Sequence, residues 1–319
     1  RSRGLGDVYK RQYIDSLSKC VKQWFYIFNI QYSSYSSRIK EHIQKLERVG
    51  WGAFPPMIMA VFTKESNEDL IWDFLDACER FNFLVFAISH RASNTQNSNL
   101  YRKAREYYVG DLDIETLTHE IDFITDGEDE EYYRGWFDLE RFKNHIKELF
   151  SKNDRDGFYS WSGLRCFLYE YELHLQDNAN SKVTWEDFNK RKKEDTIEHI
   201  YPQSANDIYW KKRFGHLKPT ERRLYLNSLG NLLLLSRSKN SKLQNYDFDK
   251  KKCLKSKEGK DIGYYNGSYS EIEVAKESEW TTERIKERGL SMLQFMEERW
   301  KFKFKDWEIE KEEILFPTK

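Results

Sequence analysis

Residues 196–252 hold the side-chain types that hydrolysis of a phosphodiester requires. Glu198 and His199 are adjacent, and Asn240 and Asn245 follow some forty residues later in what is expected to be a polar, basic loop. A neutral histidine can take a proton from water near neutral pH. A hard cation such as Mg²⁺ can clamp the phosphate and prefers oxygen ligands, which Glu198 and one of the two asparagines would supply. The stretch therefore predicts a phosphodiesterase that uses one metal ion.

Two short strands and a helix are expected to position these residues. Strands are predicted over residues 196–200 and 232–235, and a helix over about residues 247–256. Neighbouring residues on a strand point to opposite faces, which would separate Glu198 from His199. Because proline restricts itself and the residue before it, we expect a bend at residues 200–202 to bring both side chains toward one site.

The stretch resembles the HNH, or ββα-metal, nuclease superfamily, and within it the C-terminal nuclease domain of GmrSD-type, modification-dependent restriction endonucleases. The resemblance covers roughly the last 150 residues well and the preceding helical part loosely. The matching residues are Glu198, His199, Ile200, Tyr201, Pro202, Gln203, Leu229, Gly230, Asn231, Leu232, Leu234, Leu235, Asn240, Asn245, Phe248, Lys251, Trp280, Ile285, Arg288 and Trp300.

The resemblance implies roles for individual residues. His199 would be the general base, and Glu198 and Asn240 would hold Mg²⁺ or Mn²⁺. Asn231 would belong to the catalytic centre as the central asparagine that ties the loop after His199 to the second strand. Asn245 is a further candidate for the site. The implied function is DNA cleavage in a phage-defence restriction system, with modified phage DNA as a candidate substrate and a nucleotide-dependent N-terminal domain as partner.

The charge of the chain is zero overall but unevenly distributed. Lys and Arg equal Asp and Glu in number, so the whole molecule has no general attraction to nucleic acid. Between residues 236 and 260, however, basic residues clearly outnumber acidic ones. We therefore expect a phosphate-binding segment there. Its predicted nucleic-acid-binding residues are Arg237, Lys239, Lys242, Lys250, Lys251 and Lys252.

The four cysteines are far apart and show no CxxC spacing. They are typical of reduced thiols in a cytoplasmic protein, and no structural zinc site is expected. No run of apolar residues is long enough for a transmembrane helix, so no membrane partner is expected.

Apolar periodicity predicts a mostly helical α+β protein. The resemblance implies that a helical domain precedes the ββα nuclease domain and its flanking helices. Residues 1–12 look like a translated sequencing adaptor, so they are excluded from fold reasoning. Residues 13–183 are predicted to form a helical connecting domain, and residues 184–319 the nuclease domain. Helices are expected over residues 13–30, 33–49, 66–89, 100–109, 114–124, 139–150 and 161–175, and from residue 282 onward, with a strand or a frayed tail after residue 304.

Two other functions fit the same residues. One is a catalytically silent nucleic-acid-binding or scaffold protein that kept the fold, against which the joint presence of Glu198, His199, Asn231 and Asn240 argues. The other is an HNH enzyme that acts on RNA. A nicking assay on plasmid DNA with and without divalent metal would separate them.

Overall fold

The computed structural model divides the chain into two compact units, Arg1–Asp138 and Leu139–Lys319. It describes residues 2–127, 134–152, 155–176, 179–180, 182–186, 196–235 and 237–317, and of these only the backbone at residues 2–7, 237–238 and 307–308. The α+β class, mostly helical with few strands, is confirmed. The units divide well before the boundary expected after residue 183, because the helices that follow residue 138 pack against the elements of the second unit.

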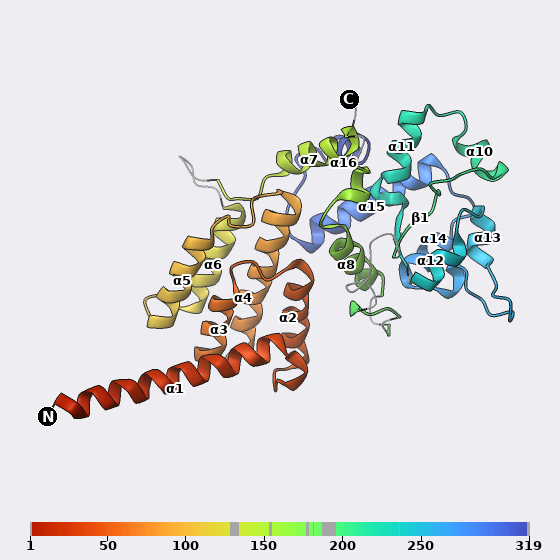
Figure 1. The fold of residues 1–319 in the computed structure, drawn as a ribbon. Coiled ribbons are helices and arrows are strands. Elements are labelled where there is room, and N and C mark those ends of the chain that lie inside the picture. The colour runs from red at the N-terminus through yellow and green to blue at the C-terminus, as the bar shows by residue number, and fades with distance from the viewer. Residues whose placement is uncertain are drawn as a thin grey trace. The chain divides into compact units, whose positions relative to one another are not determined.

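The first unit is built from helices around one apolar core. Helix α4 packs on both α2 and α6, while α3 packs on α1 and α5 (Figure 1). A helix predicted over residues 66–89 is present, and its last part is a π-helical segment, Asn82–Ile88. The α-helices are α1 Ser2–Phe28, α2 Ser37–Val49, α3 Pro55–Lys64, α4 Glu68–Phe81, α5 Asn97–Val109 and α6 Ile114–Asp126.

The second unit surrounds a two-stranded antiparallel ribbon with helices (Figure 1). Strands β1 (Ile197–His199) and β2 (Leu232–Leu234) pair with Glu198 opposite Leu233. Both strands are buried along their whole length, as expected of short strands that are covered on both faces. The helices are α7 Leu139–Ser151, α8 Leu164–Gln176, α10 Ile208–Phe214, α11 Pro219–Asn227, α12 Arg237–Leu243, α13 Phe248–Cys253, α14 Tyr269–Ala275, α15 Thr282–Arg299 and α16 Trp307–Leu315, with 3₁₀ turns η3 Gly157–Ser160, η5 Leu229–Asn231 and η6 Tyr264–Asn266.

Helix α15 fixes β2 from one side. It packs closely on η5, the turn that leads into β2. A Cβ atom at Gly230 would lie 2.0 Å from the carbonyl oxygen of Ile285 on α15, so only glycine permits this approach. Arg288 of α15 donates from Nη1 to the carbonyl oxygens of Gly230 and Leu232, at 2.9 Å each. The strand is therefore held by both close packing and charged hydrogen bonds.

Two local predictions were wrong. Residues 237–243 form helix α12, where a polar loop around Asn240 was expected, and residues 307–315 form helix α16, where a strand or frayed tail was expected. In α16, Ile314 and Leu315 are buried, and this packing stabilises a helix that its sequence pattern alone does not indicate. None of the four cysteines, all of which lie in the described part of the chain, forms a disulfide. No helix within the described residues is long and apolar enough to cross a membrane.

Candidate active site

Asn231 ties the loop after β1 to the start of β2. Its amide oxygen accepts hydrogen bonds from the backbone N–H of Tyr201 at 2.8 Å and from Trp280 Nε1 at 3.0 Å. Its amide nitrogen donates to the carbonyl oxygens of Tyr201 at 3.0 Å and Leu226 at 2.9 Å. The residue is fully buried and makes all four hydrogen bonds that an asparagine side chain commonly makes. Asn231 therefore has the tying position that was predicted, but it cannot also touch a substrate, as its place in the catalytic centre would require.

His199 lies at the end of β1 between two side chains from other elements. Its Nε2 lies 3.2 Å from Asn227 Oδ1, at the end of α11. Its ring packs against the ring of Tyr159, with centroids 4.7 Å apart. An amide oxygen can only accept, so in this contact His199 Nε2 is the donor. Nothing in the sequence distinguished Asn227, because its role depends on α11 ending beside β1.

Glu198 binds a buried lysine on the other side of β1. Lys251 Nζ lies 2.5 Å from Glu198 Oε1, and Tyr264 Oη donates to the same oxygen at 3.3 Å. Lys251 also donates to the carbonyl oxygens of His199 at 3.1 Å and Ile200 at 3.0 Å, so all three ammonium hydrogens are used. The partners of Glu198 come from α13 and η6, and those of His199 from α11 and η3. The expected convergence of the two side chains is thus not seen in these contacts, and the alternation of the strand still separates them.

Burial and charge act against each other at this pair. Burial raises the pKa of the Glu198 carboxyl, and the positive charge of Lys251 opposes the rise. Burial likewise lowers the pKa of the Lys251 ammonium, and Glu198 opposes that change. Removing either charge would therefore leave the other buried without compensation.

The side-chain oxygens of Glu198 and Asn240 are of the type that binds a hard cation such as Mg²⁺. Both hydrogen bonds to Glu198 fall on Oε1, so Oε2 remains as a second carboxylate donor. The Asn240 amide lies along the same strand, with Nδ2 at 3.5 Å from the carbonyl oxygen of Ile197. Asn245 is exposed in the turn after α12. No group of three His, Cys, Asp or Glu gathers among the described residues, so a cation here would rely on carboxylate, amide and water oxygens.

One family comparison covers this whole arrangement. The family described as GmrSD restriction endonucleases, C-terminal domain, matches residues 140–295, which include both strands, α12, α13 and every residue discussed above. Residues 140–295 are a GmrSD-type C-terminal region. No curated protein and no solved structure matches the chain. The match supports a nuclease domain of the restriction-endonuclease type in this part of the chain.

Several basic residues of the GmrSD-type region that were predicted to bind phosphates are buried instead of facing solvent. Lys251 is completely buried against Glu198, and Lys252 is buried with its Nζ donating to the carbonyl oxygens of Glu277 and Ser278. They follow Phe248, the buried anchor of α13, by three and four residues and so share its inward face. Their assignment to phosphate binding was therefore wrong.

The other predicted phosphate-binding residues divide by exposure. Lys239 is largely buried and pairs with Glu271, so it too is engaged within the protein. Lys242 and Lys250 are exposed, and Lys250 Nζ lies 3.5 Å from the ring centroid of Tyr246. The Arg237 side chain lies outside the described part of the chain. Lys242 and Lys250 thus remain candidates.

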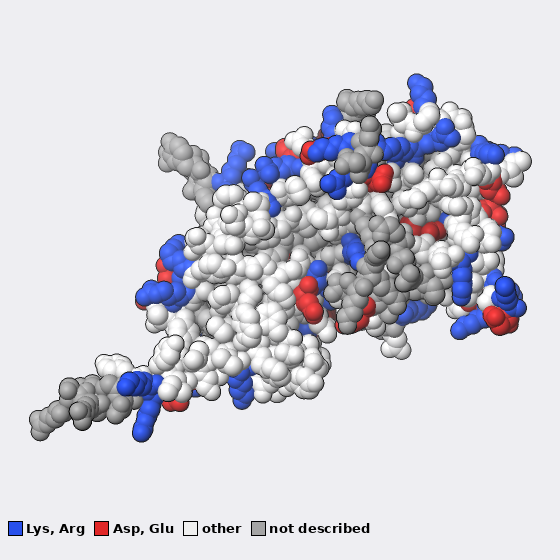
Figure 2. Space-filling view, in the orientation of Figure 1, with Lys and Arg blue, Asp and Glu red and all other residues white. Residues whose placement is uncertain are grey.

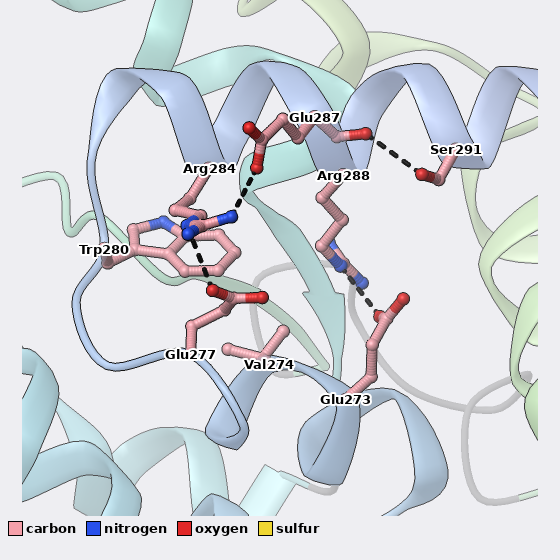
Figure 3. Close-up of a pocket in the computed structure, with 8 residues that line it drawn as sticks. All are labelled: Glu273, Val274, Glu277, Trp280, Arg284, Glu287, Arg288 and Ser291. Carbon is pink, nitrogen blue, oxygen red and sulfur yellow. Dashed lines mark hydrogen bonds and ion pairs between the residues drawn. The ribbon is translucent and has the colours of Figure 1, made fainter.

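A pocket of about 220 Å³ lies between α14 and α15 and does not include His199 or Glu198 (Figure 3). Its lining is charged: Arg284 pairs with Glu277 and Glu287, and Arg288 pairs with Glu273. Among these paired charges, Arg288 also helps to hold β2, since it donates to the backbone of that strand. The pocket therefore borders Arg288, which supports β2, and lacks the two side chains that were predicted to carry the chemistry.

Proposed function

We propose that this protein is a cytoplasmic, metal-dependent HNH endonuclease that hydrolyses DNA phosphodiester bonds as the effector of a phage-defence restriction system. The observation that supports the proposal best is the placement of His199. It ends a buried strand, is oriented by Asn227, and is adjacent in sequence to a carboxylate that keeps one oxygen for a cation. The order of two paired strands followed by α12 and α13 fits the ββα arrangement.

His199 would act as the general base. With its ring held by Asn227, the imidazole would take a proton from the water molecule that attacks phosphorus. The Tyr159 ring and the Asn227 amide restrict rotation of the imidazole, so the ring is oriented before substrate arrives. Lys251 restrains the backbone of the same residue, because its Nζ donates a hydrogen bond to the carbonyl oxygen of His199.

Glu198 Oε2 and Asn240 Oδ1 would hold the divalent ion, which neutralises phosphate charge and stabilises the leaving oxygen when bound. Burial of Glu198 against Lys251 holds its carboxylate in one place, and the short helix α12 holds Asn240 against β1. These two elements are fixed independently of the ion, so the ligands are preorganised.

Plasmid DNA should be nicked in Mg²⁺ or Mn²⁺ and left intact in EDTA. Hydrolysis without the ion would leave the phosphate charge uncompensated, so chelation should reduce the rate to background. Agarose gel analysis of supercoiled plasmid measures this directly. Equal nicking with and without EDTA would refute metal dependence, and cleavage of RNA but not DNA would refute the substrate.

Substitution of either proposed ligand should shift the metal dependence. Glu198→Gln and Asn240→Ala are expected to move the half-maximal Mn²⁺ concentration for cleavage upward, because each removes one oxygen donor from a site with few. Isothermal titration with Mn²⁺ gives the same shift without turnover. Asn245→Ala is the matched asparagine control. A shift in Asn245→Ala and none in Asn240→Ala would mean that the ligand is Asn245.

A further inference from the structure

Helices α10 and α11 form a positively charged projection next to β1. Residues 207–227, here named the basic arm, contain six Lys or Arg and two acidic residues, an excess of four positive charges in a chain whose net charge is zero. Figure 2 shows Lys and Arg side chains where Figure 1 labels α10 and α11. We propose that the basic arm binds the phosphate backbone of duplex DNA beside His199, an inference that rests on the proposed nuclease function.

Four of the six basic side chains form no ion pair within the described part of the chain. Lys211, Lys212 and Lys218 are exposed, and Arg222 is half-buried. By contrast, Arg213 pairs with Glu279. Arg223 is likewise engaged, since it donates to the carbonyl oxygens of Phe150, near the end of α7, and Lys152, just after it. The surface charge of the arm therefore comes from Lys211, Lys212, Lys218 and Arg222.

The two acidic residues of the arm are engaged at helix starts. Asp207 accepts from the backbone N–H of Tyr209 at 2.7 Å, and Glu221 accepts from the backbone N–H of Lys218 at 2.7 Å. Their charges are thus directed to the N-termini of α10 and α11, where they offset the positive ends of the helices. This leaves the lysines of the arm without an acidic partner among its own residues.

Both helices of the arm contact β1 or the loop that directly follows it. The Phe214 ring at the end of α10 stacks on Tyr201 at 3.9 Å between centroids. Asn227 at the end of α11 contacts His199 itself. Arg222 also lies close enough for its charge to oppose the rise that burial causes in the pKa of Tyr201. The positive surface is thereby held at a fixed place beside the proposed base.

The chemistry of the arm favours phosphates over bases. Proteins that bind single strands offer aromatic faces on which bases stack. In the arm, Trp210 and Phe214 are fully buried, and the Tyr209 ring is covered by the Arg213 guanidinium at 3.7 Å. Exposed lysines act as point charges that suit phosphate oxygens and carry no sequence information. A duplex, whose bases are already stacked, is the substrate that such a surface recognises.

Salt dependence of binding tests the inference. Binding of a short duplex DNA is measured by fluorescence anisotropy over a series of NaCl concentrations, in the full chain carrying His199→Ala so that the probe stays intact. The arm variant adds Lys211→Gln and Lys212→Gln. The control variant adds Lys257→Gln and Lys260→Gln, two exposed lysines between α13 and α14. Circular dichroism confirms that both are folded, and Lys218→Gln is a second arm variant.

Each phosphate that the protein no longer neutralises should flatten the slope of log affinity against log salt by about 0.9, so the slope of the arm variant should be flatter by up to about 1.8. The control should keep the parent slope, and the effect of the arm substitutions should be the same for different DNA sequences. Parent-like slopes in both arm variants, or equal flattening in the control, would overturn the inference. So would a changed slope with single-stranded RNA but not with duplex DNA. If the unsubstituted protein fails to nick DNA while the arm slope still changes, the nuclease proposal fails and the binding surface stands.

Discussion

Replacement of Lys251 by methionine is expected to lower the free energy of unfolding by about 3–5 kcal/mol, the usual cost of removing one partner of a buried ion pair. Methionine has a similar length, so the loss would come from charge and hydrogen bonding more than from volume. The variant leaves Glu198 without its counter-ion and leaves the carbonyl oxygens of His199 and Ile200 without a donor. Urea denaturation of the full chain, followed by tryptophan fluorescence, measures the change.

Two further variants isolate the cause. Lys250→Met changes the exposed neighbour on the same helix and should alter stability by no more than about 0.5 kcal/mol. Combining Lys251→Met with Glu198→Gln removes the uncompensated charge, so the pair should be less destabilised than the sum of the two single variants. If Lys251→Met is as stable as Lys250→Met, the ion pair does not hold the strand.

His199→Ala is expected to reduce the rate of DNA cleavage by about 10²–10⁴-fold, the typical contribution of a general base. DNA affinity should change little, because the imidazole is buried against Asn227 and Tyr159 and no surface charge is removed. Single-turnover cleavage of a labelled duplex gives the rate, and anisotropy gives the affinity.

His119→Ala provides the matched control, since His119 is exposed in the first unit. It should cleave DNA at the parent rate. Parent-like cleavage by His199→Ala would remove the base from the mechanism, and an equal loss in both variants would point to damage unrelated to the site.

The two strands could be predicted from the sequence because each depends on local signals. The apolar run at residues 232–235 and the short run before Pro202 are both typical of buried strands, and the structure pairs them. The tying position of Asn231 followed from the resemblance. The inward face of α13 could also have been predicted, since Lys251 and Lys252 follow Phe248 at helical spacing, but a run of lysines was interpreted as surface.

Other features depend on contacts between distant segments and were beyond sequence reasoning. Asn227 meets His199 only because α11 ends beside β1. Tyr264 reaches Glu198 across 66 residues of chain. The basic arm could not be predicted from the sequence, because a count of charges does not show which of its basic residues are paired.

The buried ribbon has a consequence for how the protein opens. The amide hydrogens that join its strands, including those of Ile200 to Asn231 and of Leu235 to Thr196, lie in the interior of the second unit. Hydrogen exchange at such amides requires an opening as large as the cooperative unit that covers them. The backbone beneath Glu198 and His199 therefore belongs to the slowest-exchanging part of the molecule. The geometry of the active site should persist through local fluctuations and disappear only when this unit unfolds.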